Sequence, residues 1–196
     1  MHDATFFDTL AARHEVPLGA TRVLAVLFVA ALTAAAAQIS IPLPFTAVPF
    51  TFQPMVVLLG GLALGAKLGV ASQVVYLAAG IAGLPVFAAS ATLPPGALRL
   101  IGPTGGYLVA YPIAALLVGY LAERGLDRRY LTSVVAMLAG LAVVYAGGAL
   151  WLGVSLGVAG ALTAGVYPFI AADVMKVLAA AGVLPGLWTL LGRASR

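Results

Sequence analysis

The chain has 196 residues, of which 63% are hydrophobic and 8% are charged, and it carries a formal net charge of +4. Soluble globular domains carry about 25% charged residues, so this composition excludes a protein that covers itself with a wettable surface. The lack of cysteine excludes disulfides and thiolate metal sites. The excess of Lys and Arg indicates anchoring of cytoplasmic loops rather than a nucleic-acid surface.

The chain begins with a polar leader, residues 1–20, which precedes a first apolar run at 21–38. That run ends in small residues, as the cleavage site of a signal peptide does. The acidic Asp3, Asp8 and Glu15 of the leader differ from the short basic start of a signal peptide. We therefore expect the run to remain in the protein as a transmembrane helix.

Six apolar segments follow one another along the chain. A bilayer core about 30 Å thick is crossed by about 20 predominantly apolar residues in a helix, and lipid-facing backbone must satisfy its own hydrogen bonds. The sequence thus predicts an all-α integral membrane protein, in which residues 21–192 form one compact bundle of six transmembrane helices. The expected helices run over about 22–37, 53–64, 68–84, 104–122, 130–153 and 167–191.

Two of the connecting segments are apolar, which is unusual for loops that face water. Residues 39–52 and 84–103 are rich in proline, and the residue before each proline is pushed away from the α region. In a six-helix arrangement both segments lie on the same, outer side. We therefore expect them to fold over a cavity as a lid.

The charged residues outside the segments predict the orientation. With a cytoplasmic N-terminus and six crossings, only Arg99 falls in an outer loop, and Lys176 lies within a span. Cytoplasmic loops carry an excess of Lys and Arg, so both termini are expected in the cytoplasm of a bacterial or archaeal cell. The cations expected inside are Arg13, Arg22, Lys67, Arg124, Arg128, Arg129, Arg193 and Arg196.

Asp173 and Lys176 are the two charged residues predicted well inside a span. A charge in that place is costly and points to a functional site. Their i, i+3 spacing puts both on one helix face. One interpretation is an ion pair that only lets the helix insert; the other is a site for a small polar ligand, because Asp accepts from N–H donors and Lys donates to a carboxylate.

Arg99 is a second candidate for holding an anionic group, and an interfacial anchor is the alternative role. It precedes a glycine-rich stretch, residues 102–106, that allows a tight turn or close backbone approach before the fourth helix. The stretch is not a phosphate-binding P-loop, so no nucleotide site is expected in this chain.

Pairs of small residues four apart allow helices to approach closely. Gly61, Gly65 and Gly69 are expected to pack inside the bundle. The pairs Ala30 with Ala34 and Ala31 with Ala35 form an alanine surface on the first helix. This surface either packs internally or docks a partner.

Four stretches appear in the order found in one family: QISIPLPFTAVPFTFQ (38–53), AGLPVFA (82–88), GPTGGYL (102–108) and GVYPFIAADVMK (165–176). Together they resemble the BioY family, the biotin-binding S components of energy-coupling factor (ECF) vitamin transporters. The resemblance covers most of residues 20–190.

The resemblance implies a biotin site near the outer face, with biotin as the transported ligand, no cofactor and no enzymatic activity. Asp173 would accept from the ureido N–H groups, and Lys176, with Arg99 as a further candidate, would face the carboxylate. Gln53, Tyr107 and Phe52 are additional candidates for lining the site. The implied partners are a membrane coupling protein (the T component) and a pair of ABC-type ATPases, docked through the surface that contains Ala30 and Ala34.

Other functions predict different features. An S component for another small vitamin would share this architecture. A self-contained secondary transporter would use Asp173 to carry a proton. A membrane enzyme would need a nucleophile with a base, or a metal-binding acidic cluster; the two histidines, His2 and His14, both lie in the leader, and Asp173 has no second carboxylate near it in the sequence.

Overall fold

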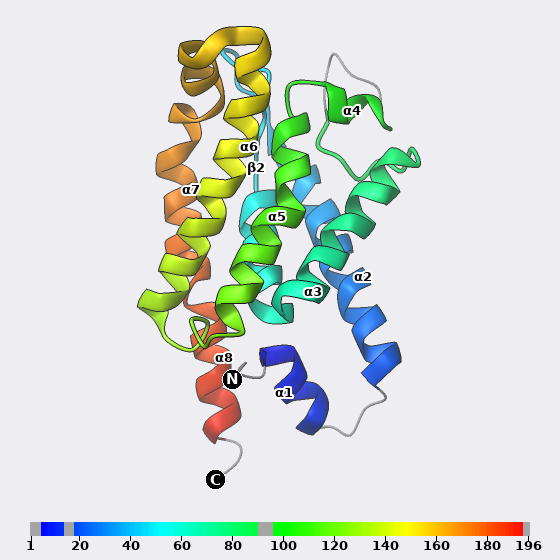
Figure 1. Cartoon of the computed structure of the whole chain (residues 1–196), viewed down its shortest axis with the longest axis vertical. Helices are drawn as coiled ribbons and strands as arrows, with labels where there is room; N and C mark the ends of the chain where they lie inside the picture. The colour runs from blue at the N-terminus through cyan, green and yellow to red at the C-terminus, as the bar shows by residue number, and fades with distance from the viewer. Residues whose placement is uncertain (1–4, 14–17, 90–95, 194–196) are drawn as a thin grey trace.

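The computed structural model describes residues 5–13, 18–89 and 96–193, which form an elongated bundle of helices (Figure 1). At the centre, α5 packs between α3 and α6, and α2 covers α3. The elements are α1 (Phe6–Arg13), α2 (Leu18–Gln38), β1 (Ser40–Ile41), β2 (Phe50–Thr51), α3 (Gln53–Ile81), α4 (Leu98–Ile101), α5 (Gly105–Ala122), α6 (Tyr130–Gly165), α7 (Tyr167–Ala180) and α8 (Val183–Arg193).

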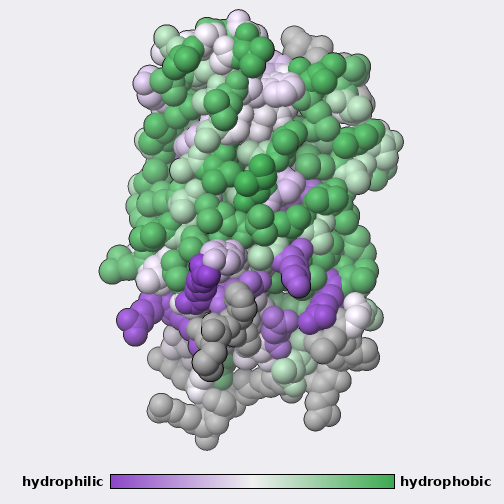
Figure 2. Space-filling view, viewed as in Figure 1, coloured by the Kyte–Doolittle hydropathy of each residue, from purple (hydrophilic) through white to green (hydrophobic). Residues whose placement is uncertain are grey.

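The surface is apolar over most of its length. Figure 2 shows hydrophobic residues covering the upper and middle parts, whereas hydrophilic residues gather in a band towards the end that carries α1 and α8. Large side chains such as Leu131, Leu150 and Val154 are 75%, 77% and 89% exposed. In water such exposure would be unfavourable, so these helix faces are suited to lipid.

The described part of the chain contains five helical stretches that are long and apolar enough to cross a membrane. They are Gly19–Gln38, Gln53–Ile81, Gly105–Ala122, Tyr130–Gly165 and Tyr167–Gly192. The chain is therefore a multi-pass membrane protein. The count is one below the six helices expected, because the segments predicted at 53–64 and 68–84 belong to the single stretch of α3.

Helix α3 is sharply bent at Gly65, whose backbone has φ 80° and ψ −180°. Only glycine adopts this conformation readily. A Cβ added to Gly69 would lie 3.2 Å from the Cα of Gly61, although residues eight apart in a straight helix are separated by about 12 Å. The two arms of α3 therefore run back alongside each other, and the expected internal packing of these glycines is confirmed.

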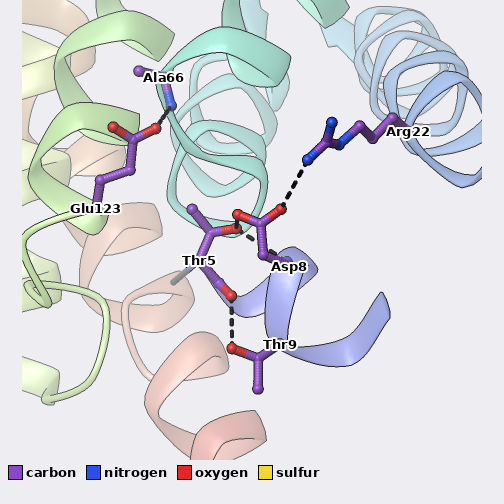
Figure 3. A network of polar contacts seen from close by, with 6 residues as sticks. All are labelled: Thr5, Asp8, Thr9, Arg22, Ala66 and Glu123. Carbon is purple, nitrogen blue, oxygen red and sulfur yellow. Dashed lines mark hydrogen bonds and ion pairs between the residues drawn. The ribbon is translucent and has the colours of Figure 1, made fainter. Parts of the chain in front are cut away.

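Glu123 caps the second arm of α3. Its carboxylate accepts a hydrogen bond of 2.9 Å from the backbone N–H of Ala66, the first residue after the bend (Figure 3). The first N–H groups of a helix have no acceptor within the helix. The Glu123 carboxylate supplies the missing acceptor for one of these groups. A residue at the end of α5 thus stabilises the turn between the arms of α3.

The leader contains a packed helix. The Thr5 hydroxyl accepts from the N–H of Asp8 at 3.1 Å and donates to its carboxylate at 2.8 Å, a reciprocal arrangement that caps α1. Arg22 of α2 lies 3.7 Å from the same carboxylate (Figure 3). Phe7 and Ala11 are buried against α2 and α3. The predicted description of residues 1–20 as a polar leader is thus incomplete, and residues 1–4 and 14–17 lie outside the described part.

The other helix boundaries differ in two places from those expected. Helix α6 continues past Gly153 to Gly165 and bends at Gly157, where φ is 69°. The segment expected as one helix over 167–191 is divided into α7 and α8 around Gly182. Hydrophobicity does not change along the chain at Gly157 or Gly182. The pattern of apolar residues therefore does not predict the bend in α6 or the division between α7 and α8.

Candidate functional site

A cavity with about 650 Å³ of empty space, its open mouth included, lies at the end of the molecule that carries the β-hairpin and α4 (Figure 1). The walls come from five helices, the hairpin and the loop that follows α3. The lining residues are Val48, Pro49, Phe50, Thr51, Gln53, Pro54, Phe87, Ala88, Arg99, Thr104, Tyr107, Leu108, Tyr111, Val144, Tyr145, Phe169 and Asp173.

The proline-rich segment 39–52 forms one wall of this cavity. Within it, β1 pairs with β2 in antiparallel register. The Thr46 hydroxyl donates to the carbonyl of Ala164 at 2.7 Å, which fastens the hairpin to the end of α6. The segment therefore covers the cavity, as its apolar composition predicts. The second apolar segment contributes Phe87, Ala88 and Arg99, and its residues 90–95 lie outside the described part.

Asp173 lies on α7, which starts just after the helix break at Val166 with Pro168 in its first turn. A proline there costs no helical hydrogen bond. The Asp173 side chain is buried and lines the cavity. One carboxylate oxygen accepts from the Tyr145 hydroxyl at 2.7 Å, and the other accepts from Lys176 at 2.7 Å. Each oxygen accepts further hydrogen bonds, so Asp173 retains acceptor capacity towards the cavity.

Lys176 forms the ion pair with Asp173 that the i, i+3 spacing allows. Its ammonium also donates to the backbone carbonyl of Thr51 at 2.6 Å and lies 3.6 Å from the centre of the Phe50 ring. Lys176 is not among the described residues that line the cavity. It lies behind Asp173, against the hairpin.

The cation on the cavity wall is Arg99, which is 8% exposed. Burial lowers the pKa of its guanidinium, and nearby Tyr76 opposes this with a smaller effect. Arginine nevertheless keeps its charge in proteins. The site thus presents a carboxylate and a guanidinium to the same space.

Three other predicted residues lie around these charges. Gln53 lines the cavity, and its amide donates to the hydroxyl of Tyr76. Tyr107 also lines it and donates to the carbonyl of Gly165 at 2.6 Å. Phe52 does not line it; its ring lies 5.0 Å from the Lys176 ammonium. The cavity therefore brings together Gln53, Arg99, Tyr107 and Asp173, and leaves Phe52 and Lys176 behind its wall.

Tyr145 is a cavity residue that sequence reasoning missed. It stands in α6 among Ala, Val and Gly residues. A tyrosine hydroxyl buried in apolar surroundings usually finds a hydrogen-bond partner, and this signal could have marked it. The rings of Phe50, Phe87 and Phe169 add apolar walls that no motif identified.

These groups are suited to binding a small polar ligand. Asp173 offers an acceptor for N–H donors, Arg99 offers donors to an anion, and aromatic rings cover the apolar part of a ligand. None of the described residues that line the cavity is a histidine, and the chain has no cysteine.

The alanine surface of α2 is divided between inside and outside. Ala30, expected on a docking surface, is 6% exposed and belongs to the core, so it packs internally. Ala34 is partly buried against the same core. Ala31 and Ala35 are exposed. Because a helix has 3.6 residues per turn, consecutive residues such as Ala30 and Ala31 point to different faces. The packing of α2 against the core decides which of the two is exposed.

Comparison with known proteins gives consistent matches. The model of the BioY family matches residues 9–193. A protein of Pyrococcus horikoshii named "Probable biotin transporter BioY" is 44% identical over 80% of this chain and 89% of its own length. The "Biotin transporter BioY" of Thermotoga maritima is 38% identical over 77% of this chain and 86% of its own length.

One solved structure shares the fold over nearly the whole chain. It is described as the S-component for biotin from an ECF-type ABC transporter, solved at 2.1 Å. The two structures superpose with a TM-score of 0.77 at 25% identity, covering 87% of this chain and 92% of that chain.

Proposed function

Because the chain belongs to the BioY family, we propose that it is the biotin-binding S component of an ECF-type vitamin uptake transporter, and that it captures biotin at the outer face of the cell membrane. The observation that carries this proposal is the cavity under the hairpin, which combines a buried carboxylate with a buried guanidinium in a fold shared with a biotin S component.

Biotin has ureido N–H donors, a ureido oxygen, an apolar ring and a carboxylate tail. Asp173 would accept from the ureido N–H groups, since its oxygens keep acceptor capacity towards the cavity. Arg99 would hold the carboxylate, because it lines the cavity while Lys176 does not. Gln53 and Tyr107 would line the site, and the aromatic walls would cover the ring.

Binding of biotin by the purified protein tests this proposal. In detergent, without any partner, the protein is expected to bind about one biotin per chain in calorimetry. An excess of thiamine or riboflavin is not expected to compete, because neither has a ureido ring joined to a carboxylate tail. Heat on adding one of these vitamins, with none on adding biotin, would instead identify an S component for a different ligand.

We further propose six spans, with the two arms of α3 crossing separately and both termini in the cytoplasm. The support is the charge distribution: Arg22, Lys67, Arg124 and Arg129 are exposed, and the hydrophilic band lies near α1 and α8 (Figure 2). The hairpin lies at the other end. Cytoplasmic loops carry the excess of positive charge, so the cavity would open to the outside.

Thiol labelling of whole cells tests this topology, because the chain has no cysteine of its own. An impermeant reagent is expected to label Ala47→Cys in the hairpin and to leave Arg129→Cys unlabelled until the cells are opened. Both positions are exposed in the structure, so lack of reaction at one reports the membrane side. Labelling of both in intact cells would contradict the six-span arrangement.

For coupling, we propose that the protein docks onto the T component through the outward stripe of α2. Leu24, Phe28, Ala31 and Ala35 follow one another at intervals of three or four residues and are all exposed. The two alanines leave a flat surface that another helix can approach closely. The T component would connect the stripe to the pair of ATPases.

Ala31→Trp is expected to weaken assembly with the T component about tenfold or more, since a large ring holds the helices apart. Biotin binding by the isolated subunit should stay unchanged. Ala30→Trp is the contrasting variant: Ala30 is in the core, so it should lower the melting temperature. Pull-down of the T component and thermal melting in detergent measure both effects. Assembly that tolerates Ala31→Trp would rule out this stripe as the docking surface.

A further inference from the structure

We propose that the loop between α5 and α6, residues 123–129, binds the phosphate group of an anionic phospholipid at the membrane surface. Its sequence, Glu-Arg-Gly-Leu-Asp-Arg-Arg, mixes two acidic residues with three arginines. The fold separates these opposite charges. The proposal does not depend on the ligand of the cavity, and only the assignment of the loop to the cytoplasmic leaflet rests on the topology proposed above.

Both acidic side chains of the loop are bound by donors from other helices. Glu123 is partly buried, and its carboxylate accepts from the backbone N–H of Ala66 in α3 at 2.9 Å (Figure 3). Asp127 is 1% exposed, and its carboxylate accepts from the indole N–H of Trp188 in α8 at 2.7 Å. The negative charges of the loop are therefore directed towards the protein.

The arginines of the loop, by contrast, are exposed: Arg124, Arg128 and Arg129. The guanidinium of Arg124 lies 3.7 Å from the centre of the Tyr120 ring, and that of Arg128 lies 4.8 Å from the centre of the Trp188 ring. A cation over an aromatic face is attracted by the ring, so these contacts restrict where the two guanidiniums lie. The loop thus presents positive charge at its outer surface.

The loop adjoins the helix surface that is suited to lipid. Tyr120 and Tyr130, on either side of the loop, are 38% and 44% exposed, and the next residue, Leu131, is 75% exposed. Figure 2 shows the hydrophilic band bordering the hydrophobic surface. Tyrosine is enriched at the depth of the lipid headgroups. With Leu131 in the hydrocarbon, the arginines are therefore expected at the level of the phosphate groups.

The chemistry of the partner follows from these features. A guanidinium offers paired N–H donors that match two oxygens of a phosphate. A zwitterionic headgroup brings a cation close to the arginines, whereas an anionic headgroup does not, so an anionic phospholipid is favoured. An acidic protein would also complement the charge, but it would not account for the exposed tyrosines and leucine beside the loop.

Quenching of tryptophan fluorescence by brominated lipids tests the proposal. The chain has two tryptophans, so Trp151→Phe leaves Trp188, which lies beside Arg128, as the reporter. Mixtures of brominated phosphatidylglycerol with plain phosphatidylcholine, and the converse mixtures, give the relative affinity of the site for the two lipids. We expect phosphatidylglycerol to be preferred about fivefold or more at low salt. High salt should reduce this preference by screening the charges.

Substitutions in the loop identify the charges responsible. Arg124→Gln with Arg129→Gln should reduce the preference to less than about twofold, while Arg128 stays beside the reporter. Arg124→Gln alone should lower it about twofold or more. Arg22→Gln is the matched control: it also removes one exposed cation, but that cation lies 3.7 Å from Asp8 and outside the loop. It should leave the preference unchanged.

Two results would overturn the proposal. Equal affinity for both lipids in the Trp151→Phe protein would do so, and would favour an acidic protein as the partner of the loop. A preference that Arg22→Gln lowers as much as Arg124→Gln does would also overturn it, because the effect would then come from net charge and not from the loop. Melting temperatures equal to that of the Trp151→Phe protein check that the variants are folded.

Discussion

Asp173→Asn is expected to raise the dissociation constant for biotin about ten- to a thousandfold. The change keeps the shape of the side chain but replaces one acceptor oxygen with a donating amide, which faces either Tyr145 or Lys176 and leaves one acceptor fewer for a ureido N–H. A hydrogen bond to a charged group contributes about 1.5–3 kcal/mol, and stranding a buried partner adds to the loss. Each 1.4 kcal/mol is tenfold in affinity.

Calorimetry on folded protein, checked by melting temperature, measures this effect. If the ion pair with Lys176 served only insertion, Asp173→Asn would lower the folded yield and leave the affinity of the folded fraction unchanged. Tyr145→Phe should weaken biotin binding less than Asp173→Asn does. Its effect on affinity should be smaller when Asp173 is already Asn, because the effects of substitutions at two hydrogen-bonded residues do not add. Tyr130→Phe is the control: it removes a hydroxyl that donates to Leu178, remote from the cavity.

Arg99→Gln is expected to weaken biotin binding about ten- to a hundredfold while changing the affinity for biotin amide by less than about twofold. The guanidinium donates to a carboxylate through paired N–H groups, and such charge-assisted bonds are about twice as strong as neutral ones. Biotin amide has no carboxylate, so it does not depend on that charge. The ratio of the two affinities isolates the contact with the tail.

The same calorimetric titrations with both ligands make this measurement. Equal loss for biotin and biotin amide would mean that Arg99 shapes the wall rather than binding the tail. No loss for either ligand would place it as an anchor at the membrane surface, the alternative that the sequence left open. Arg99→Lys keeps the charge but not the planar pair of donors, so it should restore binding only in part.

Several features of this protein follow from local properties of the sequence. A chain with 8% charged residues has to place most of its helix surface in lipid. The division between the predicted segments at 53–64 and 68–84 coincides with the bend at Gly65, where glycine takes a backbone conformation that other residues rarely adopt. The contact between Asp173 and Lys176 follows from their spacing on one helix.

The family can also be recognised from the sequence alone, because its four motifs occur in a fixed order. They identified a biotin transporter family, which the family match over residues 9–193 confirms. They did not identify Tyr145, which lies outside all four motifs and reaches Asp173 across 28 positions of the chain.

Only the tertiary structure decided which polar groups face the cavity. Lys176 reaches Thr51 across 125 positions of the chain, and this contact turns its ammonium to the hairpin and away from the ligand space. Likewise, Ala30 is buried and Ala31 exposed because α2 packs against α3 on one side. Helical spacing predicts which residues share a face, but the orientation of that face depends on packing between helices, which no local pattern records.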